Sequence, residues 1–212
     1  ALQAILTGAA VAENVDADAV GIGEMGIGNT TTSSAVLAML LGADVDKVTG
    51  RGGGITEESF RKKKAVIRTA IAVNRPNRDD VIDVLAKVGG FDLAAMCGAF
   101  LGAAASRRAA VIDGFISAVA ALCAVRLCPL VRGYLIPSHA SFEIGYRLAM
   151  EEMTLRPLFD LGMRLGEGSG CPLAFQMLDA ACAVMNNMAS FDEAGINDDY
   201  LEEIRQGDQF TP

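Results

Sequence analysis

Residues 20–41 place the tightest constraint on the fold, because a short apolar run gives way to glycines, then to hydroxyl side chains, and then to a second apolar run. This order predicts a β-strand, a glycine-rich loop and an α-helix from Ala35 to Leu41. The N–H groups of such a loop and of a helix N-terminus form a concave site for anions. We therefore predict a phosphate-binding loop here. The alternative is a tight turn followed by Thr and Ser residues that cap the helix.

The glycines at positions 21, 23 and 26 also match the G-x-G-x-x-G pattern of dinucleotide-binding proteins. This short pattern is informative only when its third glycine opens the helix and an acidic residue ends the next strand. Several residues separate Gly26 from the predicted helix, and the next strand candidate, Lys47 to Thr49, runs into the glycines at 50–54. The lysine of a P-loop is missing too. An NAD-dependent oxidoreductase is therefore kept only as an alternative.

Strand-like and helix-like runs alternate along the chain, which predicts an α/β fold with a Rossmann-like parallel sheet flanked by helices and a C-terminal helical segment. Thr56 is expected to cap a helix that runs to about Val73. The small side chains at 91–102 should let a helix pack tightly on the sheet. Further helices are expected at about 79–87, 94–106, 117–128, 142–153 and 172–188, and residues 158–165 suit a strand or a short helix equally.

We expect residues 1–170 to form the nucleotide-binding core and residues 171–212 to form a C-terminal helix and an acidic tail. The tail should be partly helical from Tyr200 to Arg205. Three methionines at 177, 185 and 188 are expected in the core of the protein, where long apolar side chains usually lie.

The clearest buried strand runs from Ala109 to Ile112 and ends at Asp113 and Gly114. The carboxyl ends of parallel strands carry ligand-binding groups, so Asp113 is a candidate binding residue. Its alternative role is to cap the helix that follows. A second strand end, at 135–141, brings serines and the only histidine, His139, together. No serine lies in a G-x-S-x-G motif, so we interpret His139 as a hydrogen-bonding residue at a strand end rather than as a catalytic base.

A second glycine-rich segment, at 163–170, places Glu167 among three glycines and a serine, just before an apolar run that begins at Cys171. Glycines allow positive φ angles and close approach of a ligand, and a carboxylate on such a turn is presented outward. Glu167 is therefore the candidate catalytic residue. Its alternative role is to complement the dipole of the following helix.

The amino-acid composition argues against several classes of function. A chain of 212 residues with 51% hydrophobic residues can bury a sizeable core, and its net charge of −8 disfavours a nucleic-acid-binding surface. Charged residues interrupt every apolar run that approaches membrane-spanning length. Five cysteines without a C-x-x-C motif indicate neither zinc nor a disulfide framework. We expect a soluble cytoplasmic protein without a metal. The start of the chain resembles an interior cut more than a signal peptide.

Four stretches, at 23–31, 87–92, 113–115 and 164–170, together resemble the nicotinate-nucleotide:dimethylbenzimidazole phosphoribosyltransferase family. The likeness extends from the start to about Met188. It implies a C-terminal part of a longer protein, whose N-terminal portion helps to form the benzimidazole pocket. It also implies a homodimer without metal or cofactor, which assembles the lower ligand of cobalamin.

The implied reaction transfers phosphoribose from nicotinate mononucleotide to 5,6-dimethylbenzimidazole, which releases nicotinate and gives α-ribazole 5′-phosphate. The attacking ring nitrogen must lose a proton, so a carboxylate can act as general base. The catalytic glutamate of the family corresponds to Glu167, and Glu24 is expected to share the proton transfer. The family resemblance also places Gly26, Gly28, Asn29 and Thr30 at the nucleotide, Gly114 and Ser141 at neighbouring strand ends, Lys63 near the phosphate and Leu165 beside the base.

Cys171, Pro172 and Phe142 depart from the small residues expected at these positions in the family. The acceptor therefore stays open among dimethylbenzimidazole, another benzimidazole, adenine and a phenolic compound. A non-catalytic nucleotide-binding domain is the second alternative to the phosphoribosyltransferase.

Overall fold

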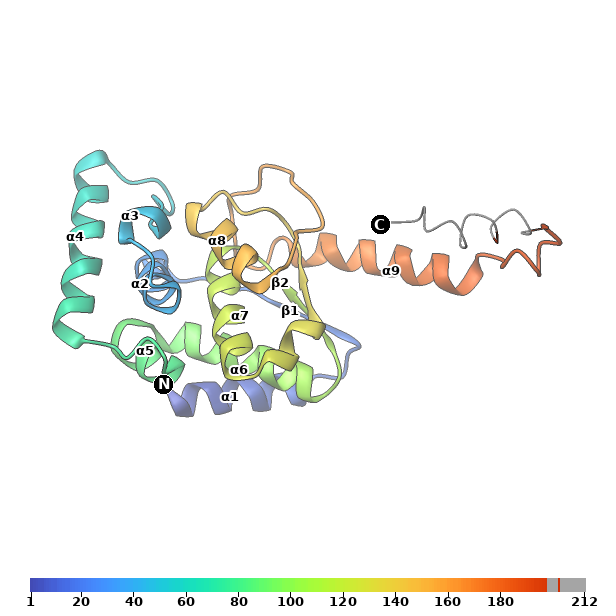
Figure 1. The fold of residues 1–212 in the computed structure, drawn as a ribbon, viewed down its shortest axis with the longest axis horizontal. Helices are drawn as coiled ribbons and strands as arrows, with labels where there is room; N and C mark the ends of the chain where they lie inside the picture. Colours follow the sequence, from blue (N-terminus) through green and yellow to red (C-terminus); the bar gives the residue numbers. More distant parts are fainter. Residues whose placement is uncertain (198–201, 203–212) are drawn as a thin grey trace. The chain divides into compact units, whose positions relative to one another are not determined.

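The computed structural model describes residues 1–197 and 202, which form two compact units, Ala1–Phe175 and Gln176–Pro212. The first unit is built on a parallel sheet of three strands in the order β1-β2-β3, with bounds Ala19–Ile22, Ala109–Ile112 and Leu135–Pro137 (Figure 1). Val20 pairs with Ala110, and Val111 pairs with Ile136. The predicted α/β fold with a parallel sheet flanked by helices is confirmed. Because the strands are parallel, the loops that follow them meet at one edge of the sheet.

The helices supply most of the core. Among the described residues they are α1 (Leu2–Glu13), α2 (Asn29–Leu41), α3 (Val45–Val48), α4 (Glu57–Asn74), α5 (Val81–Val88), α6 (Phe91–Ala105), α7 (Phe115–Leu127), the 3₁₀-helix η1 (Pro129–Tyr134), α8 (Ile144–Met153) and α9 (Cys171–Asn187). Of these, α6 and α7 pack on the strands.

The helix α7 is the most deeply buried element, since every residue from Ser117 to Ala124 is at most 2% exposed. Its sequence is apolar on all sides, as expected of a helix enclosed by other elements. Figure 1 shows α7 in the middle of the first unit, next to the sheet. Its N-terminus follows β2 directly, so the most rigid part of the fold supports the strand end at Asp113.

Local signals located several helices correctly. Thr56 caps α4, because its hydroxyl accepts a hydrogen bond from the Ser59 N–H at 3.2 Å. The Asp80 carboxylate caps α5 in the same way. Capping bonds of this kind span only a few residues, which is why the sequence reveals them.

Three local assignments were wrong. The helix α2 begins at Asn29, not at Ala35, because Gly28 takes a left-handed conformation with φ +96° and starts the helix within the hydroxyl cluster. Residues 45–48, which overlap the strand candidate, form the short helix α3, started by the Asp44 carboxylate. Residues 158–165 form neither a strand nor a helix and contribute only a single bridge, between His139 and Phe159.

The glycines of α6 pack against the helix α1, while α6 also contacts the strands β1 and β2, in agreement with the predicted packing on the sheet. A Cβ atom on Gly98 would lie 1.9 Å from the Ile5 carbonyl oxygen, and one on Gly8 would lie 1.8 Å from the Ala95 carbonyl oxygen. These separations are too short for any carbon atom, so α1 and α6 lie in backbone contact only because both carry glycines. Figure 1 shows the two helices side by side.

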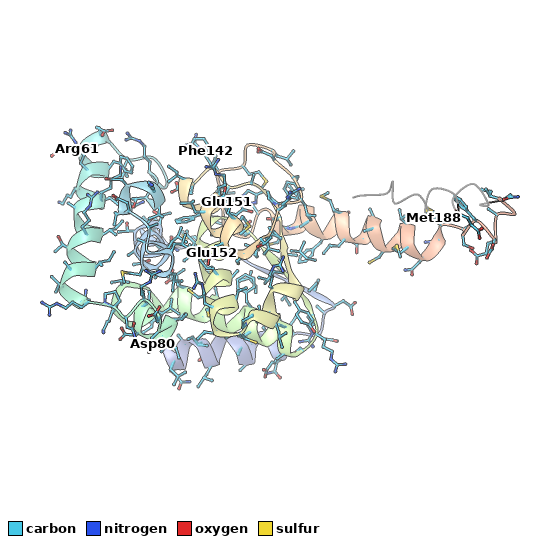
Figure 2. The ribbon with its side chains drawn as sticks, in the orientation of Figure 1. Arg61, Asp80, Phe142, Glu151, Glu152 and Met188 are labelled. Atoms are coloured by element: carbon cyan, nitrogen blue, oxygen red, sulfur yellow. The ribbon has the colours of Figure 1, made fainter. Side chains whose placement is uncertain are left out.

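The methionines predicted to lie in the core are exposed. Met177 is 43% exposed, and Met185 and Met188 are 80% and 71% exposed. Figure 2 shows the Met188 side chain at the surface. In the described part of the second unit, turns at 191–195 follow α9 and no strand is present. Of the helix expected at Tyr200 to Arg205, only Glu202 lies among the described residues, where it is helical, and the rest lies outside them. Within the described part of the chain, no helix has the length and apolarity to cross a bilayer.

Candidate active site

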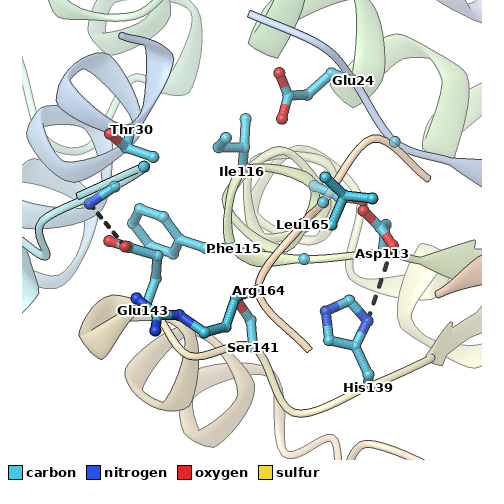
Figure 3. A pocket seen from close by; sticks show the side chains of 16 residues that line it. Glu24, Thr30, Asp113, Phe115, Ile116, His139, Ser141, Glu143, Arg164 and Leu165 are labelled. Carbon is cyan, nitrogen blue, oxygen red and sulfur yellow. Dashed lines mark hydrogen bonds and ion pairs between the residues drawn. The ribbon is translucent and has the colours of Figure 1, made fainter. Parts of the chain in front are cut away.

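A cavity of about 130 Å³ opens at the edge of the sheet where the three strands end (Figure 3). Loops at 50–54 and 164–168 complete its walls. Small-molecule sites usually enclose roughly 300–1,000 Å³, so this cavity surrounds only part of a nucleotide-sized ligand. Six of the residues predicted for the site line it: Glu24, Thr30, Asp113, Gly114, Ser141 and Leu165.

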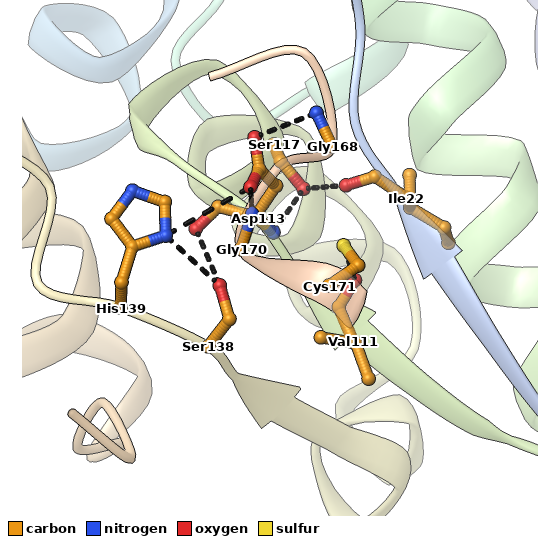
Figure 4. Close-up of polar contacts among 9 residues, drawn as sticks. All are labelled: Ile22, Val111, Asp113, Ser117, Ser138, His139, Gly168, Gly170 and Cys171. Carbon is orange, nitrogen blue, oxygen red and sulfur yellow. Dashed lines mark hydrogen bonds and ion pairs between the residues drawn. The ribbon is translucent and has the colours of Figure 1, made fainter. Parts of the chain in front are cut away.

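Asp113, at the end of β2, connects two segments of the site through its carboxylate. Its side chain does not cap α7, whose first residue is preceded by Gly114 without any side-chain cap, so the capping alternative is wrong. Instead, the carboxylate accepts hydrogen bonds from the N–H groups of Gly168 at 3.0 Å and Gly170 at 2.8 Å (Figure 4). The residue is 2% exposed. The end of β2 is thereby tied to the glycine-rich turn that carries Glu167.

His139 is buried beside Asp113, as expected for a hydrogen-bonding residue at a strand end. The Ser138 hydroxyl donates to the Asp113 carbonyl oxygen at 3.3 Å and lies 3.1 Å from Nδ1 of His139. Because that hydroxyl proton is already used, Nδ1 is the donor in the second contact. Burial lowers the pKa of His139, and the nearby Asp113 carboxylate opposes this effect. Burial thus favours the neutral imidazole, and the ring also lines the cavity.

Glu167 lies on a turn with unusual backbone geometry. The φ angles of Gly166, Glu167 and Gly168 are +77°, +58° and +76°. Such angles are unfavourable for a residue with a Cβ atom. The side chain of Glu167 is exposed at the rim, just outside the residues that line the cavity. A Cβ on Gly23 would lie 2.4 Å from the Gly168 nitrogen, so the loop after β1 passes directly against this turn.

Glu24 lies close to three other carboxylates. Burial raises the pKa of Glu24, and the negative charges of Asp92, Asp113 and Glu167 raise it further, while a hydrogen bond from Asn29 lowers it. The Asn29 amide donates to both Glu24 and Asp92, the latter at 3.1 Å. Asn29 thus bridges two carboxylates through its side chain. Sequence reasoning did not single out Asp92, although it lies in one of the four stretches that carry the family resemblance.

Lys63 supports the glycines at 50–54. Its ammonium group donates to Thr30 Oγ1 at 2.8 Å and to the Gly50 carbonyl oxygen at 2.9 Å. Burial lowers the pKa of Lys63, and the Glu143 carboxylate opposes that effect. Arg61, two residues earlier in the basic run, points outward into solvent (Figure 2). An ammonium has three donors, so one remains for a ligand after these two bonds.

Glu143 was missed by the sequence analysis. One carboxylate oxygen, Oε1, accepts from the Gly52 N–H at 2.8 Å, while Oε2 is buried without a hydrogen-bond partner in the described structure. Gly52 has φ +61°, so the bond helps to hold a left-handed loop. No local pattern marks Glu143, because its partner lies 91 residues away in the sequence. Arg164 was also missed; its guanidinium stacks 4.2 Å above the Phe142 ring.

Gly26 and Gly28 lie outside the cavity lining, and their contact with a nucleotide stays a prediction. Between them, Ile27 is 99% exposed, so this loop projects into solvent. The alternative in which Thr and Ser side chains cap α2 is wrong, since the Thr32 and Ser34 hydroxyls donate back to carbonyl oxygens of the first helical turn. The described residues contain no group of three or more His, Cys, Asp or Glu side chains that could bind a metal ion.

Comparison with known proteins identifies the family. The model of a family described as phosphoribosyltransferase matches residues 1–196. A nicotinate-nucleotide–dimethylbenzimidazole phosphoribosyltransferase of Clostridium perfringens is 56% identical over 185 residues, which are 87% of this chain and 51% of the relative. The corresponding protein of Clostridium tetani is 52% identical over 190 residues, 89% of this chain and 52% of the relative.

Among solved structures, CobT from Thermus thermophilus superimposes with a TM-score of 0.88 at 38% identity, over 93% of this chain and 60% of that one. This chain thus spans about half the length of the curated relatives that it matches. The match of the family model over nearly the whole chain shows that it belongs to this phosphoribosyltransferase family.

Proposed function

We propose that this chain carries the catalytic glutamate and the phosphate-binding loops of an enzyme that moves phosphoribose from nicotinate mononucleotide to 5,6-dimethylbenzimidazole or a related base. The products are nicotinate and α-ribazole 5′-phosphate, a precursor of the cobalamin nucleotide loop. The observation that carries the proposal is the place of Glu167 next to Gly166 at a cavity that Gly52 and Gly53 also line, in a glycine loop whose Gly50 carbonyl oxygen binds Lys63. The curated relatives named above support the same reaction. A cytoplasmic homodimer is part of the proposal.

The general base is Glu167. A benzimidazole nitrogen loses its proton as it attacks the anomeric carbon, and an exposed carboxylate at the rim can accept that proton. The raised pKa of Glu24 means that Glu24 keeps its proton to a higher pH than an ordinary glutamate. A carboxyl group that holds its proton can donate a hydrogen bond, and a second carboxylate nearby can accept a proton. Glu24 therefore helps to orient the base, and Glu167 receives the proton.

The glycine loop at 50–54 and Lys63 position the substrate. The N–H group of Gly53 and the third donor of Lys63 lie where a 5′-phosphate would be held, with Thr30 beside them, whereas the Gly52 N–H already donates to Glu143. Nicotinate leaves the ribose as a neutral pyridine ring and needs little assistance. Much of the rate should then come from alignment of the two substrates. Leu165, 67% exposed, offers an apolar face to the acceptor.

The experiment uses the longest natural protein that carries this chain, with nicotinate mononucleotide and four acceptors: dimethylbenzimidazole, benzimidazole, adenine and phenol. Mass spectrometry follows nicotinate and each ribosylated product. Glu167→Gln should lower turnover by about 100-fold or more while nucleotide affinity stays normal. Glu151→Gln, on the exposed surface of α8, is the matched control and should leave turnover unchanged.

Release of nicotinate that depends on the acceptor and collapses in Glu167→Gln would establish the reaction and rank the acceptors. A fully active Glu167→Gln enzyme would exclude Glu167 as the base. Nucleotide binding without turnover by a folded protein would support the non-catalytic alternative, and tight NAD binding would support the oxidoreductase.

A further inference from the structure

The turn that carries Glu167 does not hold its shape by local preference. Three successive residues, Gly166, Glu167 and Gly168, have positive φ angles, and the middle one is not a glycine. A conformation of this kind persists only where surrounding contacts impose it. The direction in which the Glu167 carboxylate points therefore depends on whatever holds the turn.

Asp113 supplies the contacts that hold it. The two carboxylate oxygens bind the N–H groups of Gly168 and Gly170, one and three residues after Glu167, at 3.0 and 2.8 Å (Figure 4). Hydrogen bonds to an ionised acceptor are stronger than those between neutral groups. Each oxygen of Asp113 thus constrains the backbone immediately beyond the catalytic candidate.

Asp113 is itself held in place by all three strand ends. The Ser117 hydroxyl accepts from the Asp113 N–H at 3.3 Å and donates to the Ile22 carbonyl oxygen of β1 at 2.5 Å. On the other side, Ser138, which follows β3, donates to the Asp113 carbonyl oxygen. The carboxylate is therefore a rigid connection between the sheet and the turn.

The packing under the turn leaves no room for a different arrangement. A Cβ atom on Gly170 would lie 2.3 Å from His139 Nδ1 and 3.0 Å from Asp113 Oδ1. His139 Nδ1 itself lies 3.8 Å from the same oxygen. The backbone at Gly170 packs directly against these buried polar groups. This close packing agrees with the two short hydrogen bonds that the turn donates to the Asp113 carboxylate.

We propose that Asp113 is a positioning residue for proton transfer: it fixes the turn at 166–170 so that the Glu167 carboxylate points at the attacking nitrogen. The proposal rests on the proposed function, in which Glu167 is the base. Asp113 is assigned to the turn rather than to the proton, because it is 2% exposed and both of its oxygens accept from backbone N–H groups of the turn. Its loss should therefore impair turnover through Glu167 and leave nucleotide binding largely intact.

The test is a double-mutant cycle with Asp113→Asn, Glu167→Gln and the combined variant, in the longest natural protein that carries this chain. Asp113→Asn keeps the shape of the side chain but turns an NH₂ group toward a backbone donor. We expect kcat to fall at least about 30-fold while KM for nicotinate mononucleotide changes less than about threefold. In the Glu167→Gln background the same change should lower kcat by less than about threefold, because residues that act as a unit are not additive.

The control is Val84→Ala on α5, a buried residue remote from the cavity, which lowers stability without reaching the turn. Its kcat should equal that of the unaltered enzyme. Two outcomes would overturn the proposal: an Asp113→Asn effect that multiplies fully with Glu167→Gln, or an effect confined to KM. Absence of nicotinate release by the unaltered protein would instead refute the proposed function.

A second measurement needs no variant, in case Asp113→Asn does not fold. Amide hydrogen exchange at Gly168 and Gly170 in the unaltered protein should be at least about 100-fold slower than in an unstructured chain, because both N–H groups bind a buried carboxylate. Exchange at the unstructured rate would overturn the proposal.

Discussion

Replacement of Gly170 by alanine tests how closely the turn at 166–170 packs against the buried residues beneath it. The added Cβ would lie 2.3 Å from His139 Nδ1, 2.5 Å from Ser138 Oγ and 3.0 Å from Asp113 Oδ1. These three residues are at most 2% exposed, so none of their side chains can move into solvent without cost. The turn must therefore lift away from the sheet.

The magnitude follows from two partly overlapping effects. Overpacking of a buried site costs about 1–3 kcal/mol. Lifting the turn also weakens the 2.8 Å bond between the Gly170 N–H and the Asp113 carboxylate, and a hydrogen bond to a charged group contributes about 1.5–3 kcal/mol. The φ angle of Gly170 is not positive, so no backbone strain is added. We expect the free energy of unfolding to fall by about 2–4 kcal/mol.

Substitutions at two other glycines distinguish the cost of a steric clash from the cost of backbone strain. Gly168 has φ +76° and no atom near an added Cβ, so Gly168→Ala should cost only the strain of a left-handed residue, about 1–2 kcal/mol. Gly133 has neither a positive φ nor a close neighbour, so Gly133→Ala should be neutral or stabilise by about 0.4–1 kcal/mol.

Urea denaturation followed by far-ultraviolet circular dichroism gives the three unfolding free energies. The reasoning is refuted if Gly170→Ala stays within about 0.5 kcal/mol of the unaltered protein, or if it costs less than Gly168→Ala. If the slope of unfolding free energy against urea concentration changes, rather than the midpoint, then unfolding of the variant cannot be treated as the same two-state transition.

Three further predictions concern the site and the core. The raised pKa of Glu24 makes the folded state bind that proton more tightly, so its contribution to stability is present below the ordinary value of 4.5 and is lost as pH rises through the folded value. Glu24→Gln should flatten this decline in urea midpoints between about pH 4 and about pH 8. Lys63→Met keeps the aliphatic stem but removes the ammonium, and steady-state kinetics should show a KM for nicotinate mononucleotide about 10-fold or more higher, with kcat little changed. Gly98→Ala places a Cβ 1.9 Å from the Ile5 carbonyl oxygen, so α1 and α6 must separate; urea denaturation should show a loss of about 1–3 kcal/mol, and an unchanged midpoint would contradict the close packing.

The sequence by itself determined the elements whose signals are local. The strand at 109–112, the glycine loop after β1 and the cap of Thr56 on α4 all depend on residues a few positions apart, and each was predicted correctly. Glu167 could be singled out for the same reason, because glycines beside a carboxylate are visible in eight consecutive residues. The structure then showed three successive positive φ angles in that segment.

Only the tertiary structure decided what lies under the turn and around the cavity. Asp113 binds N–H groups 55 and 57 residues further along the chain, and Glu143 binds one that lies 91 residues earlier. No periodicity or spacing encodes such pairs, because they form where loops from different strands meet at one edge of the sheet. The glycines of α6 are a second example, because the sequence shows that they are small but not which element they contact. The methionines of α9 are a third, because their spacing indicates an apolar face but not whether another element covers it. Local chemistry specifies each element, whereas the partner of each buried polar group is set by how the chain folds back on itself.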